Sequence, residues 1–216
     1  MKRSFAILGL GAFGSTVARE LARAGHDVIG IDINPKLVED VADHIGQAVV
    51  ADARDEKSLR DLGVQECDVI VVAIGEDIEA NTLATLIATD MGKPKVWAEA
   101  FNSNHHRILD KLGADHILHP EHEMGMRVAN TLMYPEVMDY ISLGHEQYVV
   151  EVRASERLAG KTLEVLHLAE HAVRCVLVKH EDEVMAPPPE HYELKVNDQI
   201  VLFGAIGDLR KISKYL

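Results

Sequence analysis

Residues 4–32, SFAILGLGAFGSTVARELARAGHDVIGID, decide the fold of this chain. An apolar run over 4–10 ends in the pattern Gly-x-Gly-x-x-Gly, which reads GLGAFG at 9–14. Apolar residues then recur at helical spacing over 15–24, and 27–32 is apolar again. The glycine pattern alone is weak evidence, but between the strand and the helix of a β-α-β unit it is typical of a dinucleotide-binding turn. The alternative is a tight turn that binds no ligand.

Three glycines and one acid have defined roles in such a turn. Gly9 permits the tight turn, Gly11 lets phosphates approach the backbone, and Gly14 lets the helix pack close to the strand. Asp32 ends the second strand, 18 residues after Gly14. Its carboxylate would accept hydrogen bonds from ribose hydroxyls and repel a 2′-phosphate, so we expect NADPH to be disfavoured.

The alternation of strand and helix patterns continues through the first 120 residues. Strands are predicted over 47–51, 68–74, 95–100 and 116–118, and helices over 35–44, 56–62, 79–91 and 103–112. This alternation predicts an α/β domain with a Rossmann-type, doubly wound parallel sheet. Two further strand ends, Asp52-Ala53 and Ala73-Ile74-Gly75, should line the same crevice as the glycine turn. The alternative for each is a plain loop.

A second region, 121–140, is predicted as one helix with apolar residues on several sides and an interruption at Pro135. A helix that is apolar on more than one face must be covered on more than one face. We therefore expect an arm that packs on another subunit, and the alternative is a kinked core helix.

The sequence pattern changes again from 143 onward. Strands are predicted over 148–152, 173–178, 183–186 and 198–204, and a closing helix over 205–215. These elements predict a small α+β module without a glycine-rich phosphate loop. The expected domains are 1–120, a crossover or dimerisation helix over 121–142, and 143–216.

Composition excludes several classes of function. The chain has 216 residues with 22 basic and 35 acidic side chains, a net charge of −13, so nucleic acid and anionic lipid should be repelled. No apolar run approaches the roughly 20 residues that span a bilayer. The N-terminal run is interpreted as a strand rather than a signal peptide, which places the protein in the cytosol. Cys67 and Cys175 have no CxxC spacing and are predicted to be buried thiols.

Histidines offer the main argument for an enzyme. Five of them fall close together: His105, His106, His116, His119 and His122. Their spacing does not place ligands four apart on one helix, so surface or interface histidines are favoured over a zinc or catalytic site. No catalytic set is evident, and the protein is predicted not to be an enzyme. The alternatives are an NAD(H)-binding oxidoreductase and a redox sensor acting on transcription.

Several longer stretches resemble one family. They are GLGAFG, VIGIDINP, DVIVVAIGEDIEANTLATLIA and NSNHHRILDKLGADHILHPEHEMG, together with the C-terminal module. The chain resembles, over essentially its whole length, the RCK (regulator of K⁺ conductance) proteins, specifically the cytosolic Ktr/Trk subunits of bacterial potassium uptake systems. The resemblance implies a nucleotide-binding RCK-N domain and an RCK-C domain that in some members binds a cyclic dinucleotide. It also implies a homodimer formed through the arm helix, and an octameric ring at the inner face of the cell membrane, beneath a potassium channel or transporter.

The resemblance also assigns site residues. It implies contact with an adenine nucleotide for Gly9, Gly11, Gly14, Asp32, Asp52 and Ala53. The full predicted cofactor site adds neighbours in the crevice and comprises Gly9, Gly11, Ala12, Phe13, Gly14, Asp32, Ile33, Asp52, Ala53, Ala73, Ile74, Gly75 and Glu99. Glu121, in the HPE stretch, matches a carboxylate that in the family helps hold a cation between paired nucleotides, and it suits Mg²⁺, Ca²⁺ or Na⁺. The alternative is an acid that caps a helix N-terminus.

Two positions depart from the family pattern. Ala12 stands where the family often has arginine (GLGRFG), and Glu99 stands where a basic residue often occurs. Both basic groups would help neutralise a terminal phosphate, and an arginine contact of this kind contributes on the order of 2–3 kcal/mol. The sequence therefore leaves ATP, ADP, AMP and NAD(H) open as ligands. It also leaves open a cation held by Glu99 and Glu121.

Overall fold

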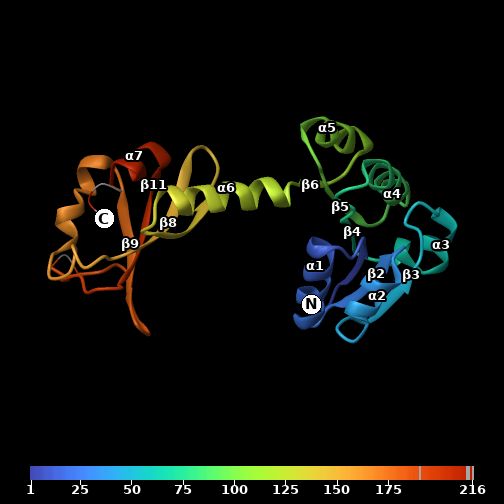
Figure 1. Ribbon diagram of the computed structural model, residues 1–216, viewed down its shortest axis with the longest axis horizontal. Helices are drawn as coiled ribbons and strands as arrows, with labels where there is room; N and C mark the ends of the chain where they lie inside the picture. Colours follow the sequence, from blue (N-terminus) through green and yellow to red (C-terminus); the bar gives the residue numbers. More distant parts are fainter. Residues whose placement is uncertain (190, 213–214, 216) are drawn as a thin grey trace. The chain divides into compact units, whose positions relative to one another are not determined.

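The computed structural model describes residues 1–189, 191–212 and 215. The chain divides into two compact units, Met1–Glu121 and His122–Leu216, which are drawn in Figure 1. Within the described part of the chain, no helix is both long enough and apolar enough to cross a membrane.

The first unit is built on a six-stranded parallel sheet. Its strands are β1 (Ser4–Leu8), β2 (Asp27–Asp32), β3 (Gln47–Val50), β4 (Val69–Val72), β5 (Lys95–Glu99) and β6 (His116–Leu118). Its helices are α1 (Ala12–Arg23), α2 (Pro35–Ala42), α3 (Glu56–Asp61), α4 (Ile78–Asp90) and α5 (Ser103–Leu112), with a 3-10 turn η1 (Val64–Glu66). The order β3-β2-β1-β4-β5-β6 confirms the predicted Rossmann-type, doubly wound sheet.

Alternating side chains of the central strands divide the core between the two faces of this sheet. Phe5 and Ile7 of β1 pack in a cluster with residues of α1 and α2. Ala6 and Leu8 pack on the other face with residues of α3, α4 and α5. Because both faces of β1 and β4 are covered, these strands appear in the sequence as continuous apolar runs.

The second unit contains a five-stranded antiparallel sheet in the order β10-β9-β11-β8-β7. Helix α6 (Pro120–Met133) begins at the end of the first unit and continues into the second. The other elements of the second unit are β7 (Val137–Ser142), β8 (Gln147–Arg153), η2 (Leu163–Leu166), η3 (Ala169–His171), β9 (Arg174–His180), β10 (Glu183–Met185), β11 (Gln199–Ala205) and α7 (Ile206–Ile212). Buried residues such as Leu166, Ile200 and Leu202 form its core. This architecture confirms the predicted small α+β module. The predicted closing helix extended to 215, and its positions 213–214 lie outside the described residues.

The predicted helix over 121–140 is wrong in its second half. α6 ends at Met133, and after Pro135 the chain forms strand β7, which pairs antiparallel with β8. Pro135 has no N–H to continue a helix, and β-branched and aromatic residues such as Tyr140 and Ile141 favour a strand once an edge is available for pairing. The expected crossover helix over 121–142 is therefore a helix followed by a strand.

Two predictions about single side chains also need correction. His105 was expected at a surface or interface, but it is buried, and burial lowers its pKa. His105 lies in the first turn of α5, and its ring is held between two polar partners: its Nδ1 accepts the backbone N–H of Phe101 at 3.2 Å, and its Nε2 lies 3.3 Å from Oγ1 of Thr82 on α4. Cys67 is buried as predicted, whereas Cys175 is only half-buried. Burial raises the pKa of both thiols.

Candidate functional site

The carboxyl ends of the parallel strands surround a cavity of about 500 Å³ in the first unit. This volume is within the range of sites for small molecules and cofactors. All of the predicted site residues except Gly14 line it: Gly9, Gly11, Ala12, Phe13, Asp32, Ile33, Asp52, Ala53, Ala73, Ile74, Gly75, Glu99 and Glu121. The structure therefore brings residues from six strand ends together in one crevice.

The glycine turn between β1 and α1 forms one wall of the cavity. Gly9 has φ +99°, and a Cβ there would overlap the carbonyl of Ala73, so only glycine fits. Gly14 lies under the turn, where a Cβ would overlap the carbonyl oxygen of Gly9. Gly11, by contrast, has no protein atom within 4 Å of its Cβ position. No contact within the protein therefore requires glycine at position 11, and the missing side chain leaves space in the cavity.

Helix α1 begins directly at this wall, three residues before its predicted start at 15. Its N-cap is Gly11, which has no capping side chain, and its first turn has no acidic residue. The positive end of the helix dipole and the unpaired N–H groups of the first turn are therefore not neutralised by the protein. Such a helix terminus favours an anion, above all a phosphate.

Asp32 connects the end of β2 to the glycine turn. Its Oδ2 accepts the backbone N–H of Leu10 at 2.7 Å, and its Oδ1 accepts the N–H of Asn34 at 2.8 Å. A carboxylate has about four acceptor positions, so two remain for ribose hydroxyls. The side chain thus holds the turn and still offers the acceptors that the sequence predicts.

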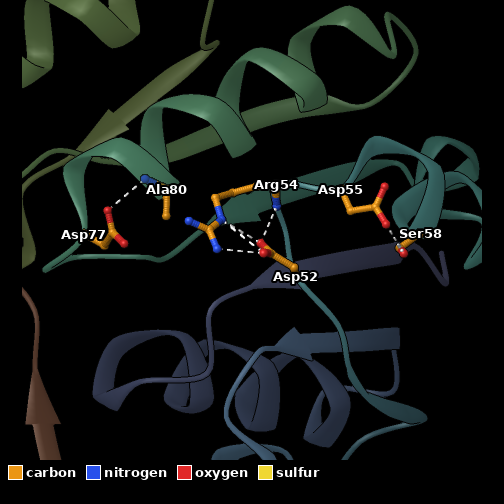
Figure 2. Close-up of polar contacts among 6 residues, drawn as sticks. All are labelled: Asp52, Arg54, Asp55, Ser58, Asp77 and Ala80. Carbon is orange, nitrogen blue, oxygen red and sulfur yellow. Dashed lines mark hydrogen bonds and ion pairs between the residues drawn. The ribbon is translucent and has the colours of Figure 1, made fainter.

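Sequence reasoning missed a cation beside the third strand end, Arg54. Its Nε donates to both carboxylate oxygens of Asp52, at 2.9 and 3.1 Å, and its Nη2 donates to Oδ2 at 2.8 Å (Figure 2). These hydrogen bonds lower the pKa of Asp52. Among the described residues that line the cavity, Arg54 is the one with a permanent positive charge. Its position directly after Asp52-Ala53 was the signal, because residues that follow a strand end face the same crevice.

The fifth strand contributes an acid at the opposite end of the cavity. Glu99 is 3% exposed, and its Oε1 lies 2.9 Å from the position that a Cβ of Gly75 would occupy. Burial, and then the charge of Glu121 and a hydrogen bond with its side chain, raise the pKa of Glu99 to about 7. The two carboxyl groups therefore meet at this end, as hard oxygen ligands for a cation of the Mg²⁺, Ca²⁺ or Na⁺ type would.

Asp77 is a second acid that sequence reasoning did not single out. It lines the cavity and caps α4, because its Oδ1 accepts the backbone N–H of Ala80 at 2.9 Å (Figure 2). An aspartate at this position satisfies a free N–H of the first turn, so a structural role accounts for it.

The histidines do not contribute to the cavity wall. His106 Nδ1, on α5, and His119 Nε2, directly after β6, lie 2.8 Å apart. No group of three or more metal-binding side chains occurs among the residues that the structure describes.

Comparison with known proteins gives matches over nearly the whole chain. Residues 5–120 match the TrkA-N domain and residues 148–216 match the TrkA-C domain. Ktr system potassium uptake protein A of Bacillus subtilis (strain 168) is 35% identical over 210 residues, which cover 97% of this chain and 95% of that protein. Ktr system potassium uptake protein C of the same organism is 36% identical over 215 residues, which cover 99% and 97%.

Solved structures with the same fold include the GsuK RCK domain, with a TM-score of 0.57 and 22% identity over 99% of this chain and 46% of that chain. A structure of GsuK bound to ADP has a TM-score of 0.55 and 25% identity over 62% of this chain and 35% of that one. The chain spans less than half of these GsuK chains but nearly all of the Ktr proteins. Its two domain matches and its identity to full-length Ktr proteins show that it belongs to the TrkA-N/TrkA-C family of potassium uptake proteins.

Proposed function

We propose that this protein is a nucleotide-binding regulatory subunit of a potassium uptake system and not an enzyme. The observation that carries the proposal is the cavity at the glycine turn, in a chain similar to Ktr proteins over its whole length. The lining residues supply a phosphate-binding helix terminus and ribose acceptors, but no nucleophile with an adjacent base.

The proposed ligand is an adenine nucleotide. The uncapped start of α1 favours phosphates, and the free acceptors of Asp32 favour ribose hydroxyls. The fold neighbour GsuK has been solved with ADP bound. Glu99 and Glu121 would repel a terminal phosphate unless a cation lies between them, so ATP should require Mg²⁺, Ca²⁺ or Na⁺ more strongly than ADP, AMP or NAD(H).

The proposed response to the ligand is a change in an oligomer. α6, all of whose residues are described, has no buried residue, and Met124, Val128 and Leu132 are exposed on it at four-residue spacing. A row of exposed apolar side chains on one helix face supports pairing with a second copy. We propose that such dimers form an octameric ring in the cytoplasm, at the inner face of the membrane, and act on a potassium channel or transporter. The cyclic dinucleotide at the C-terminal module stays a prediction.

A titration of the purified protein with nucleotides tests this function. ATP, ADP, AMP, NAD⁺ and NADH, each with and without Mg²⁺, should raise the melting temperature in proportion to their affinity, because they bind the folded state. Gly11→Ala should abolish these shifts while leaving the unliganded melting temperature unchanged, since no atom lies near its Cβ position. Gly125→Ala in α6, where the Cβ position is equally free, serves as the matched control. Absence of any nucleotide binding, or hydride transfer from NADH to a substrate, would overturn the proposal.

A further inference from the structure

The side chain of Arg54 is held in one orientation by its neighbour Asp52. Besides the three contacts of the guanidinium, Asp52 Oδ1 accepts the backbone N–H of Arg54 at 2.9 Å. Figure 2 shows the guanidinium beside Asp52, on the side toward Asp77 and Ala80 at the start of α4. The Arg54 side chain is still 42% exposed, so it is oriented without being enclosed.

The strand order indicates which part of a nucleotide Arg54 would meet. The glycine turn follows β1, Asp32 ends β2, and Arg54 follows β3, so the three lie along one edge of the sheet in the order β1, β2, β3. Neighbouring strands are about 4.8 Å apart, which places the end of β3 roughly 10 Å from the end of β1. With phosphates at the glycine turn and ribose hydroxyls at Asp32, the next group along this edge is the base.

The chemistry of this end of the cavity also suits a base. A guanidinium is planar and stacks on aromatic rings, and an arginine held in place loses little entropy when it does so. Apolar surface lies in the same cavity wall, including Ile33, which is 63% exposed, and Ala53 and Ala80. Both oxygens of Asp52 are already engaged by Arg54, so Asp52 is less suited to contact the ligand itself.

We infer that Arg54 is a base-binding residue whose guanidinium forms a stacking surface for the purine, and that Asp52 is its positioning residue. This inference rests on the proposed nucleotide-binding function. It assigns a role to Arg54, whereas the family resemblance implied nucleotide contact only for its neighbours Asp52 and Ala53. The alternative role for Arg54 is to bind a terminal phosphate of the nucleotide, a group that arginine also binds well. The two roles predict different results when Arg54 is replaced. A base-stacking role predicts the same loss of affinity for every adenine ligand, whereas a phosphate-binding role predicts a loss of affinity that grows with the number of phosphates.

Affinities of five ligands for three proteins distinguish these roles. The ligands are adenosine, AMP, ADP and ATP, with tripolyphosphate as a ligand without a base, and the proteins are wild type, Arg54→Ala and Arg54→Lys. We expect Arg54→Ala to weaken adenosine, AMP, ADP and ATP by the same factor, about three- to tenfold, which is the range for a partly exposed stacking contact of this kind. Tripolyphosphate binding should not change, and Arg54→Lys should not restore affinity, because lysine keeps the charge and loses the plane.

Arg60→Ala is the matched control. Arg60 forms a similar ion pair, with Glu56 at 2.8 Å, and its side chain is 44% exposed, but it does not line the cavity. The Arg60→Ala variant should therefore bind all five ligands with wild-type affinity. The positioning role of Asp52 predicts that Asp52→Asn weakens adenosine in the wild-type background and has no further effect in the Arg54→Ala background.

Several outcomes would overturn the inference. The first is that Arg54→Ala leaves all affinities unchanged. The second is that the loss of affinity in Arg54→Ala grows from AMP to ATP. The third is that Arg54→Ala no longer binds tripolyphosphate while Arg54→Lys has the full nucleotide affinity of the wild type. The last two would assign Arg54 to a phosphate. If the wild-type protein bound none of the ligands, the proposed function itself would fail, and that result is distinct from the others. Unliganded melting temperatures of all variants report on their folding.

Discussion

Glu99 and Glu121 meet at one end of the cavity, where burial, and then the charge of Glu121 and a hydrogen bond with its side chain, raise the pKa of Glu99. The ends of β5 and β6 bring them together, although 21 residues separate them in the sequence. Two carboxyl groups in contact share a proton more readily than they both ionise.

The first prediction concerns the pH dependence of stability. The pKa of Glu99 is about 7 in the folded protein against 4.5 ordinarily, so between these values the folded state binds more protons than the unfolded state. Stability from this group is therefore fully present below pH 4.5 and is lost as pH rises through about 7. Relative to Glu99→Gln, the free energy of unfolding of wild type should fall by about 2–3 kcal/mol between pH 4 and 8.

Urea unfolding at a series of pH values, in the presence of a chelator, measures this difference. Glu56→Gln, at an exposed carboxylate paired with Arg60, is the control and should not change the slope. Parallel curves for wild type and Glu99→Gln would show that Glu99 ionises normally in the folded protein.

A second prediction concerns Asp32. Asp32→Ala removes a charged acceptor from ribose hydroxyls and should weaken adenine nucleotides by about 1–3 kcal/mol, as measured by calorimetry. It also leaves the N–H of Leu10 without its partner, so the unliganded protein should lose stability as well. Asp27→Ala, which removes an exposed carboxylate paired with Lys2, should change neither quantity by much. Unchanged nucleotide affinity in Asp32→Ala would remove Asp32 from the site.

The glycine turn provides a third prediction, on stability alone. Gly14→Ala should lower the free energy of unfolding by about 2 kcal/mol or more, because its Cβ would overlap the Gly9 carbonyl and a rigid backbone must shift. Gly11→Ala, three residues earlier, should have little effect in the same denaturation experiment. Equal effects of the two substitutions would contradict the close packing of α1 on the turn.

The fourth prediction tests α6 as a pairing surface. Leu132 is 76% exposed, and Leu132→Lys should shift the oligomer toward smaller species in sedimentation velocity while leaving the melting temperature of the second unit nearly unchanged. Glu123→Lys introduces a lysine elsewhere on the helix, with an even larger change of charge, and should preserve assembly. A wild-type protein that sediments as a monomer at micromolar concentration would refute the pairing.

The β-α-β unit at the start of the chain could be predicted from sequence because its signals are local. Hydrophobic periodicity, a glycine turn and an acid at a fixed distance all occur within 32 residues. β7 could not be predicted in the same way. Its residues 137–142 have apolar side chains that fit either a helix or a strand, and pairing with β8 decides between them.

The site could be predicted in part for a related physical reason. Strand ends of a parallel sheet converge, so residues that follow them could be named without coordinates. Which of these residues contact one another depends on side-chain geometry. The sequence does not indicate that Asp52 is engaged by Arg54, or that the buried His105 ring contacts Phe101 and Thr82.

The hydrogen bond from the Leu10 N–H to Asp32 has a consequence for redesign of ligand specificity. In many Rossmann domains, exchange of the acid at the end of the second strand is the obvious route to a ligand with a 2′-phosphate. Here the same carboxylate also fixes the loop that would hold the phosphates, so a substitution that admits the new ligand loosens the loop for every ligand. A switch in specificity would need a second change that restores an acceptor for Leu10. Natural variants at position 32 should therefore carry such a partner change.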